Sequence, residues 1–365
     1  MQKDFHYYAT AVLALAAGFG EEDALTIAYA AQYVDDATDG RTIIVNGQPF
    51  EPKFTANNIG RYVRSYDPEV WQKVYIPFHF LPPQPLAQSS GSFITTPGSP
   101  LARQVLDAAS VDCTSLQGRI RLGVALHTFA DTWAHQGFSG RMHPENRVLK
   151  LEKLDECPFW DRIANAIDEL MDLKASLGQW LSSFTMGSSR GVGHMQAGFL
   201  ADLPYASWWA ELGPDPAGQG SRPRNVRRNN QAVFLHAAKA IYDHLAPLTK
   251  NDPFQPLTWP QIEGDLKTCL AFADLDPDDR APIWQETFAK QFPDIGLREY
   301  DSQAWERQAL GEALDVSWVD DPDSTRDVAV YKNRRGFASS PWALFHQAAS
   351  EQRRLVTSLF QIWWP

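Results

Sequence analysis

The chain has 365 residues, of which 44% are hydrophobic, 21% charged and 12% aromatic, and its formal net charge is −11. This composition excludes a disordered chain, and the excess of acid argues against charge-driven binding to nucleic acid or to an anionic membrane. The three cysteines, Cys113, Cys157 and Cys269, are too few and too dispersed for a disulfide framework or a thiolate zinc site. Any metal would therefore be held by histidine and carboxylate side chains.

Helical patterns open the chain. Residues 5–17 predict a first helix with Asp4 as a candidate N-cap, and residues 21–36 predict a second helix with acids in its first turn. The apolar run over residues 9–17 resembles a short secretory signal. Because Asp4 and His6 stand at its threshold, we interpret it as a buried helix. The chain is then expected to begin in the cytoplasm, with export by a specialised secretion machine left open.

The next segment is mixed. The Asn46-Gly47 pair between β-branched residues predicts a small hairpin. A short helix is expected over residues 57–65, an extended Pro-flanked segment around His79, and a Ser/Gly/Pro-rich loop over residues 88–100.

The rest of the chain again favours helices. Residues 101–137 predict a long helix interrupted at 112–115, and residues 160–184 and 229–248 predict two more. Residues 213–228 read as a surface loop. Two or three further helices are expected after residue 248, with a strand pair within residues 315–331. We therefore predict one mainly α-helical domain, with a core over about 1–212 and a C-terminal elaboration over about 229–365.

The segment ALHTFADTWAHQG, residues 125–137, places His127, Asp131 and His135 four residues apart each time. Positions four apart lie on one face of an α-helix. A central carboxylate can bridge two metal ions. The alternative is a solvated helix face without a metal.

The other histidines divide by their surroundings. Those in amphipathic helices, His236, His244 and His346, are interpreted as structural. Those in aromatic or glycine-rich settings are candidate ligands: His6, His79, His127, His135 and His194. His143 precedes a proline, and it is the alternative to His194.

Along the chain, the candidate ligands follow the order His6, Asp35 or Asp36, His79, His127 with Asp131, His135, His194 and Asp202. This order resembles the ligand order of zinc-dependent phospholipases C and the related single-strand-specific zinc nucleases. A closer resemblance, over nearly the full length, is to a sparsely characterised bacterial and fungal family linked to zinc metallophospholipase C activity. It is carried by the segments DFHYYATAVLALAAGF, AAQYVDDATD, IPFHFLP, GHMQAGFLADLP and SPWALFHQAA.

The chain departs from that pattern in three places. The superfamily uses its α-amino group as a ligand, but Met1 precedes His6 by only five positions, so Asp4 or a main-chain group is the candidate replacement. His135 follows Asp131 by four residues rather than six. The acid expected four residues after His194 is a glycine, so Asp202 would have to serve.

The resemblance implies two or three Zn²⁺ ions. Asp35, His79 and His127 would hold one, His135, His194 and Asp202 a second, and His6 with Asp4 a third, with Asp131 as the bridge. Two zinc ions about 3.5–4 Å apart lower the pKa of a bridging water for attack on a phosphodiester. Whichever of Asp35 and Asp36 is not a ligand would orient the water or protonate the leaving group. We favour Asp35 as the ligand.

The expected function is a zinc-dependent phospholipase C with the phospholipase C fold. It would cleave a phosphatidylcholine-like phospholipid at a membrane interface, by attack of a metal-bound hydroxide, to diacylglycerol and a phosphorylated headgroup. Rings near the ligands could hold a quaternary ammonium group or pack the core: Tyr7, Tyr33, Phe78, Phe80, Trp133, Phe138 and Trp208. The alternatives are a zinc nuclease or nucleotidase on the same cluster, and a helical metal-binding or interaction protein without activity. The sequence contains no membrane span and leaves the oligomeric state open.

Overall fold

The computed structural model describes most of the chain. The described residues are 1–56, 70–84, 92–154, 161–162, 165, 191–215, 217, 221–249, 256–293, 295–311, 316–319 and 328–360. The helix expected over 57–65 and nearly all of the one expected over 160–184 lie outside these residues, as does Cys157.

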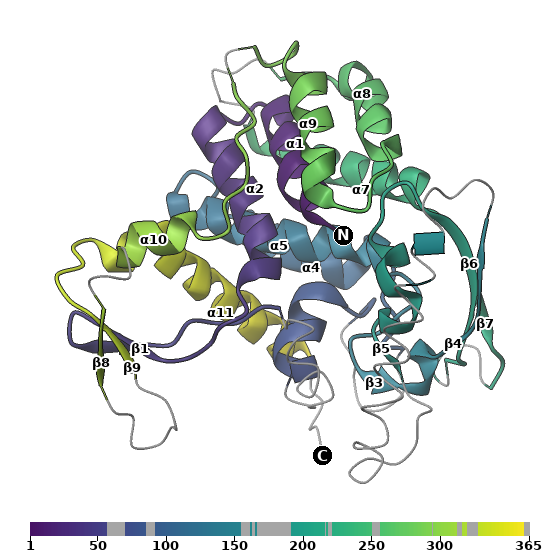
Figure 1. Cartoon of the computed structure of the whole chain (residues 1–365), viewed down its shortest axis with the longest axis horizontal. Coiled ribbons are helices and arrows are strands. Elements are labelled where there is room, and N and C mark those ends of the chain that lie inside the picture. Colours follow the sequence, from purple (N-terminus) through teal and green to yellow (C-terminus); the bar gives the residue numbers. More distant parts are fainter. Residues whose placement is uncertain are drawn as a thin grey trace, which may run out of the picture.

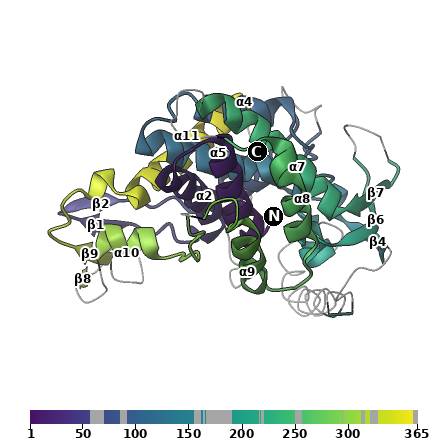
Figure 2. The same cartoon turned by 90° about the horizontal axis from the view of Figure 1, so that it is seen from above.

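The described part of the chain is mainly helical, with small sheets at its two ends (Figures 1 and 2). The central helix α5 packs against α2, α4, α7 and α11, and α1 packs against α2 and α7. The α-helices are α1 (Thr10–Ala17), α2 (Glu21–Asp36), α4 (Pro100–Ala109), α5 (Leu116–Ala134), α7 (Asn230–Leu245), α8 (Trp259–Ala271), α9 (Pro277–Phe288), α10 (Ala304–Leu310) and α11 (Pro341–Leu359).

Shorter helical turns complete the body. Two of them are π-helical, η1 (Asp4–Ala9) and η3 (Trp71–His79). The 3₁₀ turns are η4 (Pro144–Asn146), η5 (Met195–Ala201), η6 (Ala246–Thr249) and η8 (Phe337–Ser339).

Two sheets flank the helical body. The first has the strand order β2-β1-β9-β8 and joins the predicted hairpin, β1 (Ile43–Val45) and β2 (Gln48–Phe50), to β8 (Val316–Val319) and β9 (Val328–Tyr331). The hairpin turns at Asn46 and Gly47, whose φ values of 52° and 80° suit the tight turn that such a pair forms. β1 and β9 pair in parallel, so segments almost 300 residues apart in the sequence share one sheet.

The second sheet has the order β4-β6-β7 and consists of β4 (Val148–Lys153), β6 (Ser207–Leu212) and β7 (Arg224–Asn229). A separate two-stranded pair is formed by β3 (Met142–His143) and β5 (Gly191–Val192), which lie before and after β4 in the sequence. The prediction of a surface loop reaching residue 228 is therefore wrong. The sequence RNVRRN of β7 has one apolar residue and lacks the alternation that marks a strand, and its pairing with β6 supplies the extended conformation.

Other predictions have mixed outcomes. Residues 21–36 form α2 as predicted, and α7 begins after its N-cap Asn229. The predicted break between α4 and α5 is present, but α5 ends at Ala134. The prediction of two or three late helices is too low, because α8 to α11 make four.

The expected extended segment around His79 is also wrong, because His79 ends the π-helix η3. The Phe80 N–H donates to the carbonyl of Tyr75, five residues earlier, at 2.7 Å. Pro77 suggested an extended chain, but η3 packs against α5 and α11, and its apolar side chains are buried there. Tertiary packing thus outweighs the local preference.

Helices α2 and α5 approach closely at Gly123. A Cβ added at Gly123 would lie 2.3 Å from the Ile27 carbonyl oxygen and 2.6 Å from Ala30 Cβ. A side chain there would push the two helices apart. The glycine therefore sets the distance between the helix that carries Asp35 and the one that carries His127 and Asp131.

None of the described helices combines the length and the apolar character needed to span a bilayer.

Candidate metal centre

The candidate ligands come from the ends and the middle of several elements. His6 lies on η1, Asp35 near the end of α2, and His79 on the last turn of η3. His127 and Asp131 are buried in α5. His135 follows as the C-cap residue of α5, while His194 and Asp202 flank η5 as its caps. Residues spread over almost 200 positions therefore meet at one place.

These side chains form three groups in which every potential ligand atom lies within 4.8 Å of the others. The groups are His6, His127 and Asp131; Asp35, His79 and His127; and His135, His194 and Asp202. His127 belongs to two of them. Each group contains imidazole and carboxylate, the donor set that suits zinc and other borderline divalent metals.

Asp131 lies at the centre of these contacts. Its Oδ1 lies 3.2 Å from His6 Nε2, and its Oδ2 lies 3.1 Å from His79 Nδ1 and 3.2 Å from His127 Nε2. His135 Nδ1 is 3.5 Å from the same Oδ2. A fully buried carboxylate is thus surrounded by four imidazole rings. The spacing along α5 predicted two of them, His127 and His135, and the resemblance implied His6 and His79.

Main-chain carbonyls orient four of the rings. The second ring nitrogen of His127 lies 2.8 Å from the carbonyl oxygen of Ala31, and that of His79 lies 2.8 Å from the carbonyl of Thr55. His135 Nδ1 lies 2.8 Å from the His79 carbonyl, and His194 Nδ1 lies 3.0 Å from the Gly198 carbonyl. Because a carbonyl only accepts hydrogen bonds, each of these nitrogens carries the proton. The other nitrogen of each neutral ring then keeps its lone pair.

Those lone-pair nitrogens face carboxylate oxygens. His127 Nε2 and His79 Nδ1 face Asp131, and His135 Nε2 and His194 Nε2 lie 3.2 Å and 3.3 Å from the Asp202 carboxylate. Two lone pairs at this distance repel unless a proton or a metal ion lies between them. Although burial lowers the pKa of His79, the Asp131 carboxylate raises it above its ordinary value, so a proton and a metal ion compete for this position. A second ring nitrogen bound to a main-chain carbonyl is the usual arrangement of metal-ligating histidines. The donor set therefore fits divalent metal ions.

His6 gives a further indication. The ring is fully buried and stacks on His127 with 3.8 Å between ring centroids. Among the described residues neither His6 nitrogen makes a hydrogen bond, although Nε2 lies 3.2 Å from Asp131 Oδ1. Burial and the neighbouring His127 lower the pKa of His6 well below its usual value. A buried polar group without a hydrogen bond is costly, and a bound cation would offset that cost.

The charges of the centre leave it acidic. When the imidazoles are neutral, the formal charge of the centre is −2, the sum of three carboxylates (Asp35, Asp131 and Asp202) and one amino group. Burial raises the pKa of Asp35. For Asp131, burial has the same tendency, but His135 and His127 in their protonated form, together with the Met1 amino group, lower its pKa well below the usual value. A cation bound among these groups would neutralise the remaining charge.

The Met1 amino group also lies in the centre, and the sequence-based ligand set omitted it. Its nitrogen is 2.5 Å from Asp131 Oδ1 and 3.3 Å from Asp202 Oδ1. Burial alone lowers the pKa of this amine, but the charges of Asp131, Asp202 and Asp35 raise it to about 11. The α-amino ligand of the resembling superfamily was the available signal. The short distance to His6 in the sequence argued against it, but the π-helix η1 brings both groups to Asp131.

Asp4 does not join the three groups and is corrected in both of its predicted roles. Its carboxylate accepts two hydrogen bonds of 3.0 Å from the guanidinium of Arg280, and both side chains are buried. The N-cap position is occupied by Lys3, without a side-chain cap. We therefore remove Asp4 from the candidate ligands.

Asp36, the other candidate catalytic acid, lies apart from the three groups. Its Oδ2 accepts hydrogen bonds from the hydroxyl of Tyr300 at 2.7 Å and from Gln32 Nε2 at 3.1 Å. Successive residues of a helix point about 100° apart, so Asp35 faces the metal centre while Asp36 faces away. Of the two acids, the structure brings only Asp35 to the ligands.

Arg228 of β7 supports the turn that carries His135. Its Nη1 donates to the Ala134 carbonyl at 3.0 Å, and the side chain is buried. A cation at the C-terminal end of a helix is favourable. Strand β7, which the sequence did not predict, therefore holds the C-terminal end of α5 in place.

The rings expected near the ligands are all buried. Phe78, Phe138 and Trp208 have no exposed surface, and the others are at most 9% exposed. Phe80 stacks on His135 with 4.4 Å between centroids. The rings are therefore packing residues, and Tyr33 lies against Phe345 and His346, away from the candidate ligands. They form no exposed surface for a quaternary ammonium group at the metal centre.

The chain matches the model of a protein family over residues 1–360. It belongs to the DUF6765 family. That family is described as one of unknown function, so membership of DUF6765 assigns no activity to the centre. No curated protein and no solved structure matches the chain. The case for a function of this DUF6765 chain therefore depends on the arrangement of its own residues.

His143, the alternative to His194, lies outside the three groups. Its Nδ1 is 3.1 Å from Glu145 Oε2, and Arg141 donates to the same carboxylate through two hydrogen bonds of 2.9 Å. Burial alone raises the pKa of Glu145, but these neighbours lower it to about 2.

This shift predicts an acid-dependent loss of stability. A carboxyl group whose pKa is lower in the folded state stabilises the fold above its unfolded pKa of about 4.5, and the contribution is lost as the pH falls toward 2. The difference corresponds to about 3 kcal/mol. Urea unfolding between pH 6 and pH 2 should therefore show a smaller pH dependence for Glu145→Gln than for the wild type. If the free energy of unfolding depends on pH equally in the two proteins, the lowered pKa of Glu145 is contradicted.

Proposed function

We propose that the chain is a zinc-dependent phosphodiester hydrolase of the phospholipase C type. The observation that supports this most is the set of four imidazoles, each with one ring nitrogen on a main-chain carbonyl and the other facing a carboxylate. Metal-ligating histidines usually have this arrangement, in which the second ring nitrogen is held by a main-chain carbonyl or a carboxylate.

The three groups define which residues would hold the ions. One ion would be held by Asp35, His79 and His127, and a second by His135, His194 and Asp202. His6, His127 and Asp131 would hold a third ion. Asp131 is the proposed bridge, because its carboxylate oxygens lie within 3.2 Å of His6, His79 and His127. Closely spaced zinc ions supply an activated water at neutral pH and neutralise the charge that develops on a phosphodiester.

The chain's own residues divide into buried and open parts of the centre. His6, His127 and Asp131 are almost without exposed side-chain surface, whereas Asp35 is 32%, His194 19% and Asp202 14% exposed. A substrate phosphate would therefore approach along the edge formed by these three. The main-chain carbonyls that hold the imidazoles fix the ring positions before the substrate arrives.

The net charge of −11 makes a polyanionic substrate less favourable than a phospholipid headgroup. This, together with the resemblance of the ligand order, makes a glycerophospholipid our preferred substrate over a nucleic acid.

The test compares two substrates on the same protein. Purified protein is assayed with a chromogenic phosphocholine ester and with single-stranded DNA, before and after removal of metal by a chelator and after addition of Zn²⁺. We expect hydrolysis of the ester that the chelator abolishes and zinc restores. Cleavage of DNA alone would replace the lipid by a nucleic-acid substrate. Bound zinc without hydrolysis of either would reject the enzymatic proposal in favour of a metal-binding protein.

A further inference from the structure

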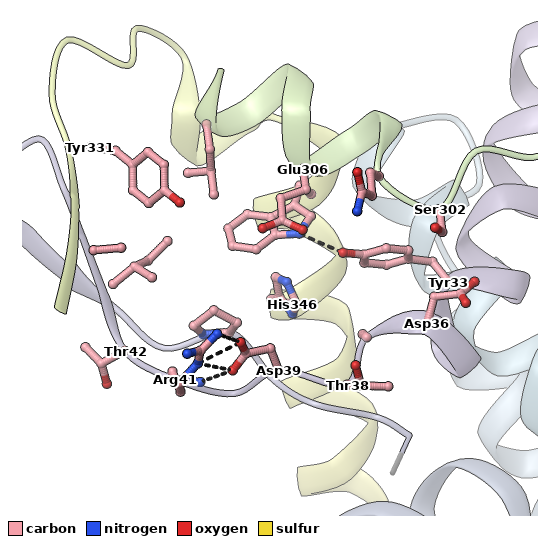
Figure 3. Close-up of a pocket in the computed structure, with 17 residues that line it drawn as sticks. Tyr33, Asp36, Thr38, Asp39, Arg41, Thr42, Ser302, Glu306, Tyr331 and His346 are labelled. Carbon is pink, nitrogen blue, oxygen red and sulfur yellow. Dashed lines mark hydrogen bonds and ion pairs between the residues drawn. The ribbon is translucent and has the colours of Figure 1, made fainter. Parts of the chain in front are cut away.

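A pocket of about 330 Å³ lies on the other side of the α2 end from the metal centre. It is lined by residues from α2, the hairpin segment, α10, β9 and α11, and Asp36 faces it while Asp35 faces the metal centre. Figure 3 shows the His346 ring between the side chain of Glu306 and the ion pair of Asp39 with Arg41. Its volume is at the lower end of the range for small-molecule sites, about 300–1,000 Å³.

Glu306 is a partly buried carboxylate without a partner. The described residues provide it with no hydrogen bond and no ion pair. Burial and the charge of Asp39 raise its pKa. Asp36 and Asp39 also line the pocket, and the one arginine there, Arg41, is already paired with Asp39. A bound cation would therefore be favourable next to Glu306.

His346 contributes a neutral hydrogen-bond donor. The ring is 3% exposed, and Nδ1 lies 3.0 Å from the main-chain N–H of Lys53 and 3.3 Å from the Lys53 carbonyl. In the shorter contact Nδ1 accepts from the N–H, and we assign the proton to Nε2 on that basis. Nε2 has no hydrogen-bond partner among the described residues. A ligand that also offers an acceptor to this nitrogen would satisfy it.

The residues that line the pocket limit the class of ligand that it can bind. Aromatic rings of Tyr33, Tyr331 and Trp342 line the pocket beside the acids, and aromatic faces favour organic cations. The ligand group that accepts a hydrogen bond from His346 is better a hydroxyl than a carboxylate. A ligand carboxylate would be repelled, because three acidic side chains and only one arginine line the pocket. A hydroxyl and an ammonium group together characterise amino alcohols and amino sugars.

We propose that this pocket binds a small hydroxylated amine, with its ammonium group at Glu306 and a hydroxyl at His346. The site is separate from the metal centre, and the proposal does not rest on the proposed hydrolase activity.

Isothermal titration calorimetry with glucosamine and ethanolamine tests the proposal, with glucose and butylamine as probes that lack one of the two groups. We expect saturable binding of at least one hydroxylated amine, and binding of glucose and butylamine weaker by about tenfold or more. The Glu306→Gln variant should bind the hydroxylated amine more weakly than the wild type by a similar factor. The matched control, Glu286→Gln on an exposed position of α9, should leave binding unchanged.

A pair of variants at His346 separates binding from folding. His346→Gln keeps a donor near the position of Nε2, whereas His346→Asn keeps an acceptor for the Lys53 N–H, and its shorter side chain does not carry the amide N–H to the position of Nε2. We expect binding to survive in the first and to weaken in the second, with similar melting temperatures. The proposal is overturned if no amine binds saturably, if glucose binds as well as glucosamine, or if Glu306→Gln binds like the wild type.

Discussion

Asp131→Asn is expected to remove more than one metal ion per chain. Asp131 belongs to the group of His6 and His127, and its carboxylate also lies 3.1 Å from His79 Nδ1 and 3.5 Å from His135 Nδ1, next to the other two groups. We therefore expect its loss to affect more than one ion. Loss of residues that only orient ligands typically costs 10–100-fold in metal affinity, so loss of a shared ligand should cost about 100-fold or more. Elemental analysis of wild type and variant after equilibration with Zn²⁺ measures the stoichiometry.

Asp36→Asn is the matched control for this variant. It makes the same chemical change at a carboxylate that binds Tyr300 and Gln32 and lies outside the three groups. It should keep the metal content and the hydrolysis rate of the wild type. Unchanged stoichiometry in Asp131→Asn would reject the central role of Asp131. Loss of activity with retained metal in Asp36→Asn would restore the alternative that Asp36 is the catalytic acid.

Asp4→Asn is expected to destabilise the fold strongly without removing metal. Asp4 and Arg280 form a buried, two-pronged ion pair that joins η1 to α9, with 1% and 0% exposure. Removing one partner of a buried pair leaves a charge without compensation and typically costs about 3–5 kcal/mol. For a chain of this length, the melting temperature should fall on the order of 5 °C.

Two controls separate this effect from a general one. Asp243→Asn breaks the exposed pair of Asp243 with Lys239 on α7 and should leave the melting temperature almost unchanged. Asp4→Asn combined with Arg280→Met should recover part of the lost stability, because no unpaired charge remains. If Asp4→Asn instead lowers the zinc content at unchanged stability, Asp4 is a ligand after all.

The sequence predicted those parts of the fold in which local signals agree with the final packing. Helix α2 has acids at its start and an apolar face, and the hairpin has the Asn46-Gly47 turn. It failed where long-range contacts determine the conformation. β7 becomes a strand through its pairing with β6, and η3 becomes helical although it contains Pro77.

The part of the candidate centre that lies on α5 was predictable, because histidine and aspartate at helical spacing lie on one face of a helix. The ligands on other elements were implied only by the resemblance in ligand order. His127 and Asp131 show this most directly. The roles of Asp4 and Met1 could not be predicted in the same way. Arg280 lies 276 positions from Asp4, and the sequence contains no local signal that the two meet.

The position of α11 bears on how the centre assembles during synthesis. Gln352 of α11 donates hydrogen bonds to the Pro77 carbonyl at 2.9 Å and to the Thr128 hydroxyl at 2.7 Å, on the two elements that carry His79 and His127. All candidate ligands lie before residue 203, but Gln352, which makes these two hydrogen bonds, is translated 150 residues after the last of them. A ribosome-bound fragment that ends before α11 would thus contain every ligand and still lack the helix that fixes two of them. The affinity of nascent chains for zinc should rise late, when α11 emerges, rather than when the last ligand does.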